Sequence, residues 1–434
     1  NSLLVDLSAG QVLSSDSLQP INDVIALCET SEFFTALLST PPDFRSLLSE
    51  FPELLSEDRV PDLRKHGVQH FIVTSPGPPV AAKARRLHPE KLLAAQTEFL
   101  QLEKDGVIRR SSSPWSSPLH LVPKADGSYQ SCGDYRRLNV RTQPDMYPVP
   151  NMQDLSARLH GKTIFSKLDL KKGYHQIPLH PDDIPKTAVN TPFGLWEYIT
   201  MPFGLRNASQ TFQRAMDQIL GDLPYVYVYL DDILIASTSR EEHILHVRTV
   251  FQRLQDHGLV LHLAKCVIGV SSLEFLGYQL SPSGLTPLRK HVLAVENFPP
   301  PANLKDLQRY LGMLNFFRRF LPSIAQTIKP LTDLLRSDKK SGLLRSDKKQ
   351  EFLWSPAAQT SFESSKRSLC LAATLQHPDP TAQLSLAVDA SATHVGACLQ
   401  QKKGKNWAPL AFFSKKLNPP EEKYSAFDRE LLGM

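Results

Sequence analysis

The chain has 434 residues, of which 41% are hydrophobic and 21% are charged, and its formal net charge is +5. These values are typical of an ordinary globular protein, and this length suggests about three domains. No apolar run reaches the roughly 20 residues of a membrane span, so no membrane partner is expected. The mild positive charge is compatible with a polyanionic partner.

The five cysteines form no C-x-x-C pair, so neither a zinc knuckle nor a disulfide framework is predicted, and a reducing, intracellular setting is expected. The chain opens with Asn1 rather than Met, no signal peptide follows, and a helical pattern runs to Met434. These ends predict a piece of a longer polyprotein. Residues 1–79 are punctuated by prolines, with a strand expected near Leu3–Leu7 and a helix near Ser31–Leu38, and we interpret them as a leader or linker.

Clearer signals begin at Pro89, where an apolar helical period runs as far as Gly106. A Ser/Pro-rich loop follows, and then two β-prone runs, residues 119–124 and 129–135, are joined through Asp126-Gly127. An Asp-Gly between such runs is a strong hairpin signal. Basic residues cluster around this hairpin, and without further context a solvated surface is the simpler reading. The cluster consists of Lys124, Arg136, Arg137 and Arg141.

The organising stretch of the chain is the pair of β-prone runs in Tyr225–Ala236, which flank the adjacent acids Asp231 and Asp232. The pattern reads as strand, tight turn, strand. Two acids among apolar residues are costly unless a cation pairs with them, and divalent metals prefer oxygen ligands. An ordinary hairpin with an acidic turn fits this stretch alone equally well. A further strand, Thr163–Leu170, carries Asp169 at its end.

Downstream, an amphipathic helix is predicted over residues 241–258 and a strand over Phe275–Leu280. A basic helical section then runs to about Lys349. Within it the heptapeptide LLRSDKK occurs at residues 334–340 and again at 343–349, and the second copy is expected to lengthen an exposed loop. The tail predicts a helix over 357–370, three strands within 384–414 and a final helix from Tyr424.

Four motifs in this order carry a family resemblance: FSKLDLKKGYHQI from Phe165, MPFGLRNASQTFQ from Met201, YLDD from Tyr229, and FLGY from Phe275. Together they closely resemble the reverse transcriptase of gypsy-type LTR retrotransposons, over about residues 80–434. The stretch Leu3–Ser8 is similar to the end of a retropepsin domain, but no Asp-Ser/Thr-Gly triplet occurs, so no protease activity is expected.

The resemblance implies an α+β, right-hand polymerase with fingers, palm and thumb, followed by a truncated RNase H-like α/β piece. The implied domains are a leader over 1–79, fingers and palm over 80–284, thumb and connector over 285–350, and a partial RNase H-like domain over 351–434. The implied activity is RNA- and DNA-directed DNA synthesis from a primer. Implied partners are an RNA or DNA template with its primer, deoxynucleoside triphosphates and the rest of the Pol polyprotein, with a protease before and the remaining RNase H and an integrase after. Cytoplasmic particles are the setting expected by resemblance.

The family's site residues carry over as follows. The catalytic, metal-binding carboxylates would be Asp169, Asp231 and Asp232, holding two Mg²⁺ ions, with Mn²⁺ as a substitute. The two adjacent acids can reach one cluster only if they sit at a turn, because neighbouring residues on a strand face opposite ways. Nucleotide-binding residues would be Lys124, Arg136, Tyr174 and Phe203, with Tyr174 rejecting a 2′-hydroxyl. The primer grip would be Phe275, Leu276, Gly277 and Tyr278.

Two features depart from the family pattern. Gln130 stands where the family usually has an Arg that grips the triphosphate, and an amide cannot make a guanidinium's charge-assisted, bidentate contacts. We therefore keep an alternative function, a catalytically impaired relic that only binds nucleic acid. In the tail, Asp389 and Glu430 match the first two RNase H carboxylates only, so the RNase H site is expected to be incomplete and inactive.

Overall fold

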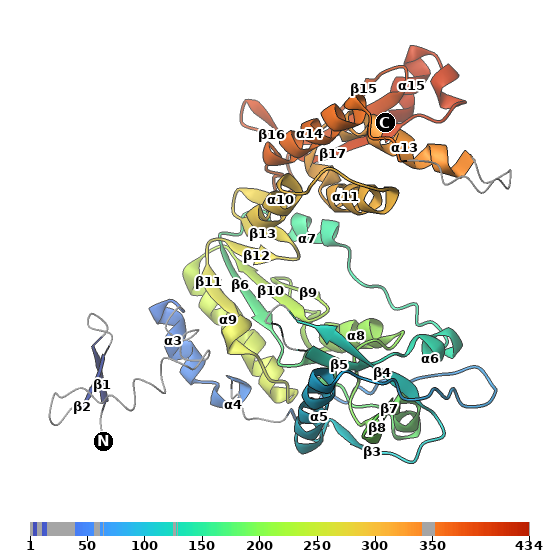
Figure 1. Cartoon of the computed structure of the whole chain (residues 1–434). Coiled ribbons are helices and arrows are strands. Elements are labelled where there is room, and N and C mark those ends of the chain that lie inside the picture. The colour runs from blue at the N-terminus through green and yellow to red at the C-terminus, as the bar shows by residue number, and fades with distance from the viewer. Residues whose placement is uncertain are drawn as a thin grey trace. The chain divides into compact units, whose positions relative to one another are not determined.

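The computed structural model describes residues 3–6, 11–14, 40–55, 61–63, 65–124, 127, 129–340 and 352–433 (Figure 1). The helix predicted near Ser31–Leu38 and the second LLRSDKK copy lie outside these ranges. Two compact units are present: residues 1–150 with 164–270, and residues 151–163 with 271–434. The first strands, β1 (Leu3–Asp6) and β2 (Gln11–Ser14), pair as an antiparallel hairpin, which confirms the strand predicted at the start of the chain.

A five-stranded sheet in the order β3-β8-β7-β4-β5 forms one half of the first unit. Its strands are β3 (Ile108–Arg110), β4 (Ser117–Pro123), β5 (Tyr129–Gly133), β7 (Val189–Thr191) and β8 (Gly194–Tyr198). The predicted Asp-Gly hairpin is confirmed by the antiparallel pairing of β4 with β5. Helix α5 (Pro89–Lys104) packs beside β5, and helix α6 (Arg136–Arg141) follows that strand. Phe99 of α5 is fully buried against the rings of Phe193 and Trp196.

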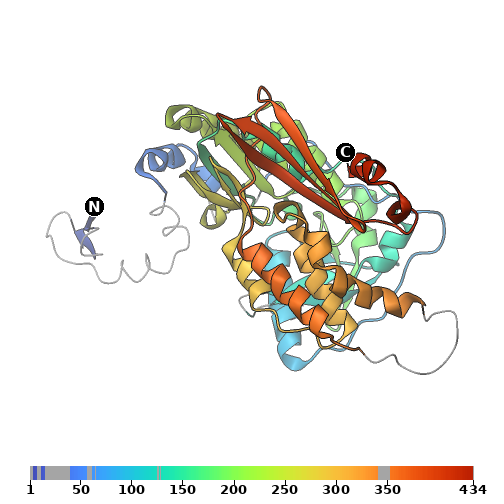
Figure 2. The same cartoon turned by 90° about the horizontal axis from the view of Figure 1, so that it is seen from above.

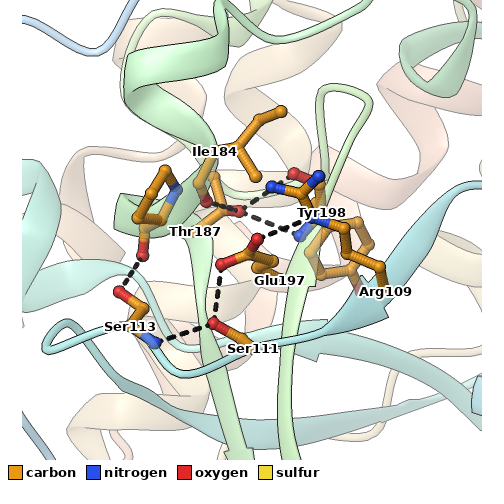
Figure 3. A network of polar contacts seen from close by, with 8 residues as sticks. Arg109, Ser111, Ser113, Ile184, Thr187, Glu197 and Tyr198 are labelled. Carbon is orange, nitrogen blue, oxygen red and sulfur yellow. Dashed lines mark hydrogen bonds and ion pairs between the residues drawn. The ribbon is translucent and has the colours of Figure 1, made fainter.

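A polar network ties this sheet to the irregular segment beside it (Figure 3). Glu197 of β8 is nearly buried, accepts hydrogen bonds from Arg109 Nε at 2.7 Å and from Ser111 Oγ at 2.6 Å, and so has both carboxylate oxygens bonded. Thr187 accepts a hydrogen bond from the Tyr198 backbone N–H at 3.0 Å and donates to Ile184 O at 2.7 Å. The 3₁₀ segment η2 (Pro181–Thr187) is thereby fixed to β8.

The other half of the first unit is a four-stranded antiparallel sheet in the order β11-β6-β10-β9, whose strands β9 and β10 form the acidic hairpin. Its strands are β6 (Ile164–Asp169), β9 (Val226–Tyr229), β10 (Asp232–Ser237) and β11 (Val267–Val270). Helices α8 (Ala208–Leu220) and α9 (Arg240–Asp256) contact these strands and bury their apolar faces there (Figure 1). Short 3₁₀ turns follow β6 and precede β11, namely η1 (Gly173–Gln176) and η3 (Leu263–Lys265).

Part of the predicted leader joins this core. Helices α3 (Pro42–Ser49) and α4 (Pro52–Leu55) and Phe51 between them bury six apolar side chains in the same hydrophobic cluster as α9. The Phe51 ring lies edge-on to Phe251 at 5.5 Å, and Leu261 donates its backbone N–H to Leu54 O at 2.9 Å. An amphipathic pair of short helices can be stable only when its apolar face is covered in this way.

The second unit begins with α7 (Met152–Arg158) and the sheet β12 (Leu273–Phe275), β13 (Tyr278–Ser281) and β14 (Gly284–Pro287). A helical section follows, as predicted, made of α10 (Arg289–Glu296), α11 (Leu304–Phe316), η4 (Arg318–Phe320), α12 (Ile324–Thr327) and α13 (Lys329–Lys340). The buried Tyr310 joins this section to the next helix through a 2.6 Å hydrogen bond to Ser365.

The tail contains α14 (Pro356–Cys370), the three-stranded antiparallel sheet β15 (Leu384–Ala390), β16 (His394–Lys403) and β17 (Asn406–Lys416), the turn η6 (Glu421–Lys423) and α15 (Ala426–Gly433). Figure 2 shows these strands side by side, as their pairing requires. Most of β15 is solvent-exposed, including Leu384 and Leu386. Within the described ranges, none of the helices is both long enough and apolar enough to cross a membrane.

Candidate active site

The acidic hairpin closes through a two-residue turn, Leu230-Asp231, because Tyr229 of β9 pairs directly with Asp232 of β10. Leu230 has a φ of +53°, in the left-handed region. Tight hairpins favour positive φ at such positions because it matches the twist of the strands, but a leucine there costs about 1–2 kcal/mol. The surrounding structure must therefore hold the turn in place.

Gln213 of α8 holds it. The Gln213 side chain is fully buried, and its Oε1 accepts a 2.9 Å hydrogen bond from the backbone N–H of Leu230. Its Nε2 donates to Val228 O at 3.2 Å and to Asp217 Oδ1 at 3.0 Å. Asp217 in turn accepts from the Tyr147 hydroxyl at 2.8 Å. These contacts fix which end of the amide faces the turn. The sequence reasoning missed Gln213, although a lone amide between Phe212 and Met216 on an apolar helix face was a possible signal.

The turn brings the three predicted carboxylates together, because Asp169 on β6 lies directly opposite Asp232 on β10, with Asp231 beside them. Burial, followed by the charges of Asp169 and Asp232, raises the pKa of Asp231 to about 6. Burial also raises the pKa of Asp169, partly offset by the positive charges of Lys265 and His262. Clustered, partly desolvated carboxylates of this kind favour a proton or a metal cation.

The carboxylates fit a divalent cation by their chemistry. Asp231 Oδ1 is buried and has no hydrogen-bond partner among the described residues, and hard cations such as Mg²⁺ take carboxylate oxygens. No three acidic, histidine or cysteine side chains of the described ranges are already gathered as a ready-made metal cage. Asp232 is drawn aside, since its Oδ1 lies 2.7 Å from the ammonium of Lys167.

Gly173 gives Asp231 the room it occupies. A Cβ on Gly173 would lie 3.3 Å from Asp231 Oδ1 and 3.3 Å from Phe212. The neighbouring Tyr174 ring meets Phe203 edge-on at 5.0 Å and Phe212 at 5.3 Å. Burial and the charge of Asp231 raise the pKa of the Tyr174 phenol to about 12. The predicted nucleotide residues Tyr174 and Phe203 therefore lie together, beside the carboxylates.

The two basic residues predicted to bind the nucleotide are in a different environment. Lys124 is exposed at the end of β4, and Arg136 is engaged with Asp134 at 2.6 Å. Arg85 also bridges to Asp134 at 2.6 Å, and these guanidinium groups, Arg136 first, hold the pKa of Asp134 well below its usual range. Gln130 sits on β5 opposite Val122.

The predicted primer-grip residues lie in the second unit. Phe275 pairs with Tyr278 across a two-residue turn formed by Leu276 and Gly277, whose φ values of +47° and +87° suit a tight hairpin. Phe275 is buried, and the ring of Tyr278 stacks on Phe316 at 5.1 Å. Leu276 and Gly277 are thus at the tip of a hairpin braced by aromatic packing.

The two predicted RNase H carboxylates also lie in the second unit. Asp389 is on β15 and Glu430 is on α15, which packs beside β15, and both residues are exposed.

Comparison with known proteins now identifies the class. Residues 122–280 match the family model described as reverse transcriptase (RNA-dependent DNA polymerase), and residues 354–434 match that of the RNase H-like domain found in reverse transcriptase. The chain therefore carries a reverse transcriptase domain followed by an RNase H-like domain of the kind found in reverse transcriptases. This confirms the predicted class, and the palm carboxylates and Tyr174 lie within the first match.

More particularly, the chain is similar to polyproteins of gypsy-type retrotransposons. It is 33% identical over 399 residues to the Transposon Tf2-3 and Tf2-7 polyproteins of Schizosaccharomyces pombe. The similar region is 91% of this chain but only 29% of each relative, so the chain spans less than a third of the curated relatives it matches.

Solved structures support the polymerase fold. The foamy viral protease-reverse transcriptase dRH in complex with double-stranded DNA matches with a TM-score of 0.83 at 22% identity, over 93% of this chain and 70% of that one. The foamy viral protease-reverse transcriptase in complex with an RNA/DNA hybrid matches with a TM-score of 0.78 at 21% identity, over 93% and 54% of the two chains. The predicted α+β polymerase fold with an RNase H-like tail is thus confirmed.

We expect Gln213→Leu to misplace the catalytic turn. The change keeps the side-chain volume but leaves the Leu230 N–H without its partner and removes one hydrogen bond of Asp217, which costs about 1–3 kcal/mol of stability. A turn displaced by a fraction of an ångström should lower kcat by about tenfold or more with little change in nucleotide KM. Steady-state primer extension and urea unfolding measure the two effects. Gln210→Leu, a half-buried residue of the same helix, is the control, and equal kcat values for both variants would contradict the assignment.

We expect Asp231→Asn to stabilise the metal-free protein at alkaline pH. The folded-state pKa of Asp231 is raised from the ordinary 3.8 to about 6, so the folded protein favours the protonated form of this carboxyl group. Its contribution to stability is fully present below about pH 4 and is lost as the pH rises through 6. At pH 8 in EDTA the variant should unfold with a free energy about 2–3 kcal/mol higher than the wild type, and the gap should close near pH 4. Urea unfolding across this range measures it. Asp256→Asn, exposed on α9, should follow the wild type, and a wild-type-like Asp231→Asn profile would contradict the prediction.

Proposed function

We propose that this chain extends a primer by nucleotidyl transfer on an RNA or DNA template, with Asp169, Asp231 and Asp232 binding two divalent metal ions. The observation that carries the proposal is the buried Oδ1 of Asp231, which finds no hydrogen-bond partner within the described ranges and lies beside two further carboxylates and an aromatic pair. A structural hairpin would gain nothing from burying an unpaired carboxylate oxygen.

Each palm residue has a part in this scheme. The ions, when bound, would clamp the attacking and leaving oxygens and offset the charge that develops on the phosphoryl group. Asp169 and Asp231 are the main ligands and Asp232 is the supporting one. Leu230 and Gln213 set the angle at which the turn presents Asp231. The chain's remaining contribution is positioning, since phosphoryl transfer needs little covalent chemistry from side chains.

Tyr174 and Phe203 are proposed as the floor of the nucleotide pocket. Their edge-to-face contact, reinforced by Phe212, fixes the Tyr174 ring where it can lie under the incoming sugar. A rigid ring at that place leaves no space for a 2′-hydroxyl, which gives selection for deoxynucleoside triphosphates. Burial keeps the Tyr174 phenol protonated, so it adds no charge to the pocket.

The template and primer are proposed to contact the basic helical section over residues 285–350 and the hairpin tip at Leu276-Gly277. The foamy viral reverse transcriptases similar to this chain are solved with double-stranded DNA and with an RNA/DNA hybrid. Binding carried by lysine and arginine contacts to phosphates should weaken steeply with added salt. The remaining Pol domains are proposed as partners because the similar transposon polyproteins are more than three times as long as the matched region.

Primer extension tests the proposed activity. The chain, supplied with an RNA template, a DNA primer, deoxynucleoside triphosphates and Mg²⁺, should extend the primer, and Asp231→Asn should reduce the rate by at least about a thousandfold because one metal ligand is lost. Tight binding of the template and primer without extension would instead support the alternative function, a relic that only binds nucleic acid.

Gln130 is the observation that favours this alternative. The amide cannot replace the phosphate contacts of a guanidinium, and Arg136 is already paired with Asp134. We therefore expect Gln130→Arg to lower the KM for deoxynucleoside triphosphates by about tenfold, the value of one charge-assisted contact, with little change in kcat. Gln130→Lys is a useful comparison, since a point charge should recover part of the effect. An unchanged KM in Gln130→Arg would remove Gln130 as a cause of impairment.

For the tail we propose that this chain alone does not cleave RNA. Only Asp389 and Glu430 match the family's catalytic acids; Asp389 lies on β15 and Glu430 on α15, and both are exposed. A labelled RNA–DNA hybrid should stay intact. Fragment release that disappears in Asp389→Asn would overturn the proposal.

A further inference from the structure

Lys167 occupies an unusual place in the palm sheet. It lies on the inner strand β6, two residues before Asp169, so both side chains share one face. Its neighbours across the sheet are Leu234 on β10 and Val267 on β11. A lysine flanked by apolar residues on an inner strand, with its side chain only 23% exposed, is a costly placement that requires a partner for the ammonium.

That partner is a carboxylate of the proposed metal site. Lys167 Nζ lies 2.7 Å from Asp232 Oδ1, and the Asp232 side chain is 26% exposed. Lys167 faces Leu234, two residues beyond Asp232 on the paired strand, so the contact is a diagonal one that a long side chain can span. The ion pair therefore ties Asp232 to a cation on the neighbouring strand β6.

The pair changes the charge of the site. Asp169, Asp231 and Asp232 contribute three carboxylates, and Lys167 neutralises one of them by direct contact. Lys265, exposed on η3, adds a second positive charge whose field reaches the other two carboxylates. A lysine used only for packing would not need to contact a carboxylate of this cluster.

We propose that Lys167 is a resident cation that competes with divalent metal for Asp232 and so lowers the metal affinity of the palm. In the metal-free protein its ammonium holds Asp232. On metal binding Asp232 must exchange Lys167 for the metal, and the ammonium stays close enough to repel the incoming ion. Lys167 is thus a positioning residue for the carboxylates. The inference rests on the proposed function, because it assumes that these carboxylates bind metal.

A Mn²⁺ binding titration tests the inference without any catalytic turnover. Binding is measured as the decrease in the electron paramagnetic resonance signal of free Mn²⁺. Lys167→Met keeps the length and apolar stem of the side chain and removes the charge. It should bind Mn²⁺ about tenfold more tightly than the wild type, as expected for removing one nearby positive charge. Lys167→Arg keeps the charge and should bind like the wild type.

Lys186→Met is the matched control. Lys186 is 20% exposed and pairs with Asp183 at 2.6 Å in the same unit, outside the carboxylate cluster. This variant should lose stability without any change in Mn²⁺ affinity. The rise in melting temperature on adding Mn²⁺ is a second measurement, and it should be larger for Lys167→Met than for the wild type.

The outcomes separate the two proposals. If Lys167→Met binds Mn²⁺ no more tightly than the wild type, the proposed role of Lys167 is overturned. The proposed function still stands in that case, provided that the wild type binds Mn²⁺ and Asp231→Asn does not. If Asp231→Asn binds Mn²⁺ as tightly as the wild type does, or if none of the proteins binds Mn²⁺, both the role of Lys167 and the proposed function are overturned.

Discussion

The palm depends on one geometric constraint, which is that two adjacent aspartates must reach a third across a sheet. On a straight strand, Asp231 and Asp232 would face opposite sides. The two-residue turn removes this conflict by taking Asp231 out of the strand while Asp232 begins β10 opposite Asp169. The strained backbone of Leu230 is a consequence of that solution. Strain of this kind persists only where the surrounding structure over-determines it.

Two contacts offset the cost of the arrangement, and they act on different parts of it. Gln213 supports the backbone of the turn, and its own orientation is set by Asp217 and Tyr147, so a residue at position 147 bears on the catalytic geometry. Lys167 supports the charge, by pairing with Asp232. Neither contact reaches Asp231, whose buried Oδ1 has no hydrogen-bond partner in the described part of the chain. The cost of burying an unpaired charge thus falls mainly on the Asp231 carboxylate. Such perturbed groups are typical of functional sites, where a bound ligand can offset the cost.

Sequence reasoning located the three aspartates, Tyr174 and the polymerase fold because each lies in a short motif with a local signature. It missed Gln213 and Lys167, although both stand inside quoted motifs, since their roles depend on partners on other strands and helices. It also treated residues 40–55 as part of a leader. The helices there are short, and their apolar faces are covered by α9, which lies about 200 residues later in the chain. Periodicity shows that a face is apolar, but not what covers it.

In the fingers, the sequence departs from the family pattern at Gln130, while the predicted hairpin still forms. The β4–β5 hairpin forms with Gln130 in place, so the change acts on binding rather than folding. Arg136 is 83% exposed on its side chain and is held only by Asp134, which Arg85 also contacts. Arg136 contacts both carboxylate oxygens of Asp134, and Arg85 contacts one of them. A triphosphate carries more charge than a carboxylate, so we expect it to compete with Asp134 for the exposed Arg136 side chain. Under the proposed function, Gln130 would then weaken the phosphate contacts without abolishing them.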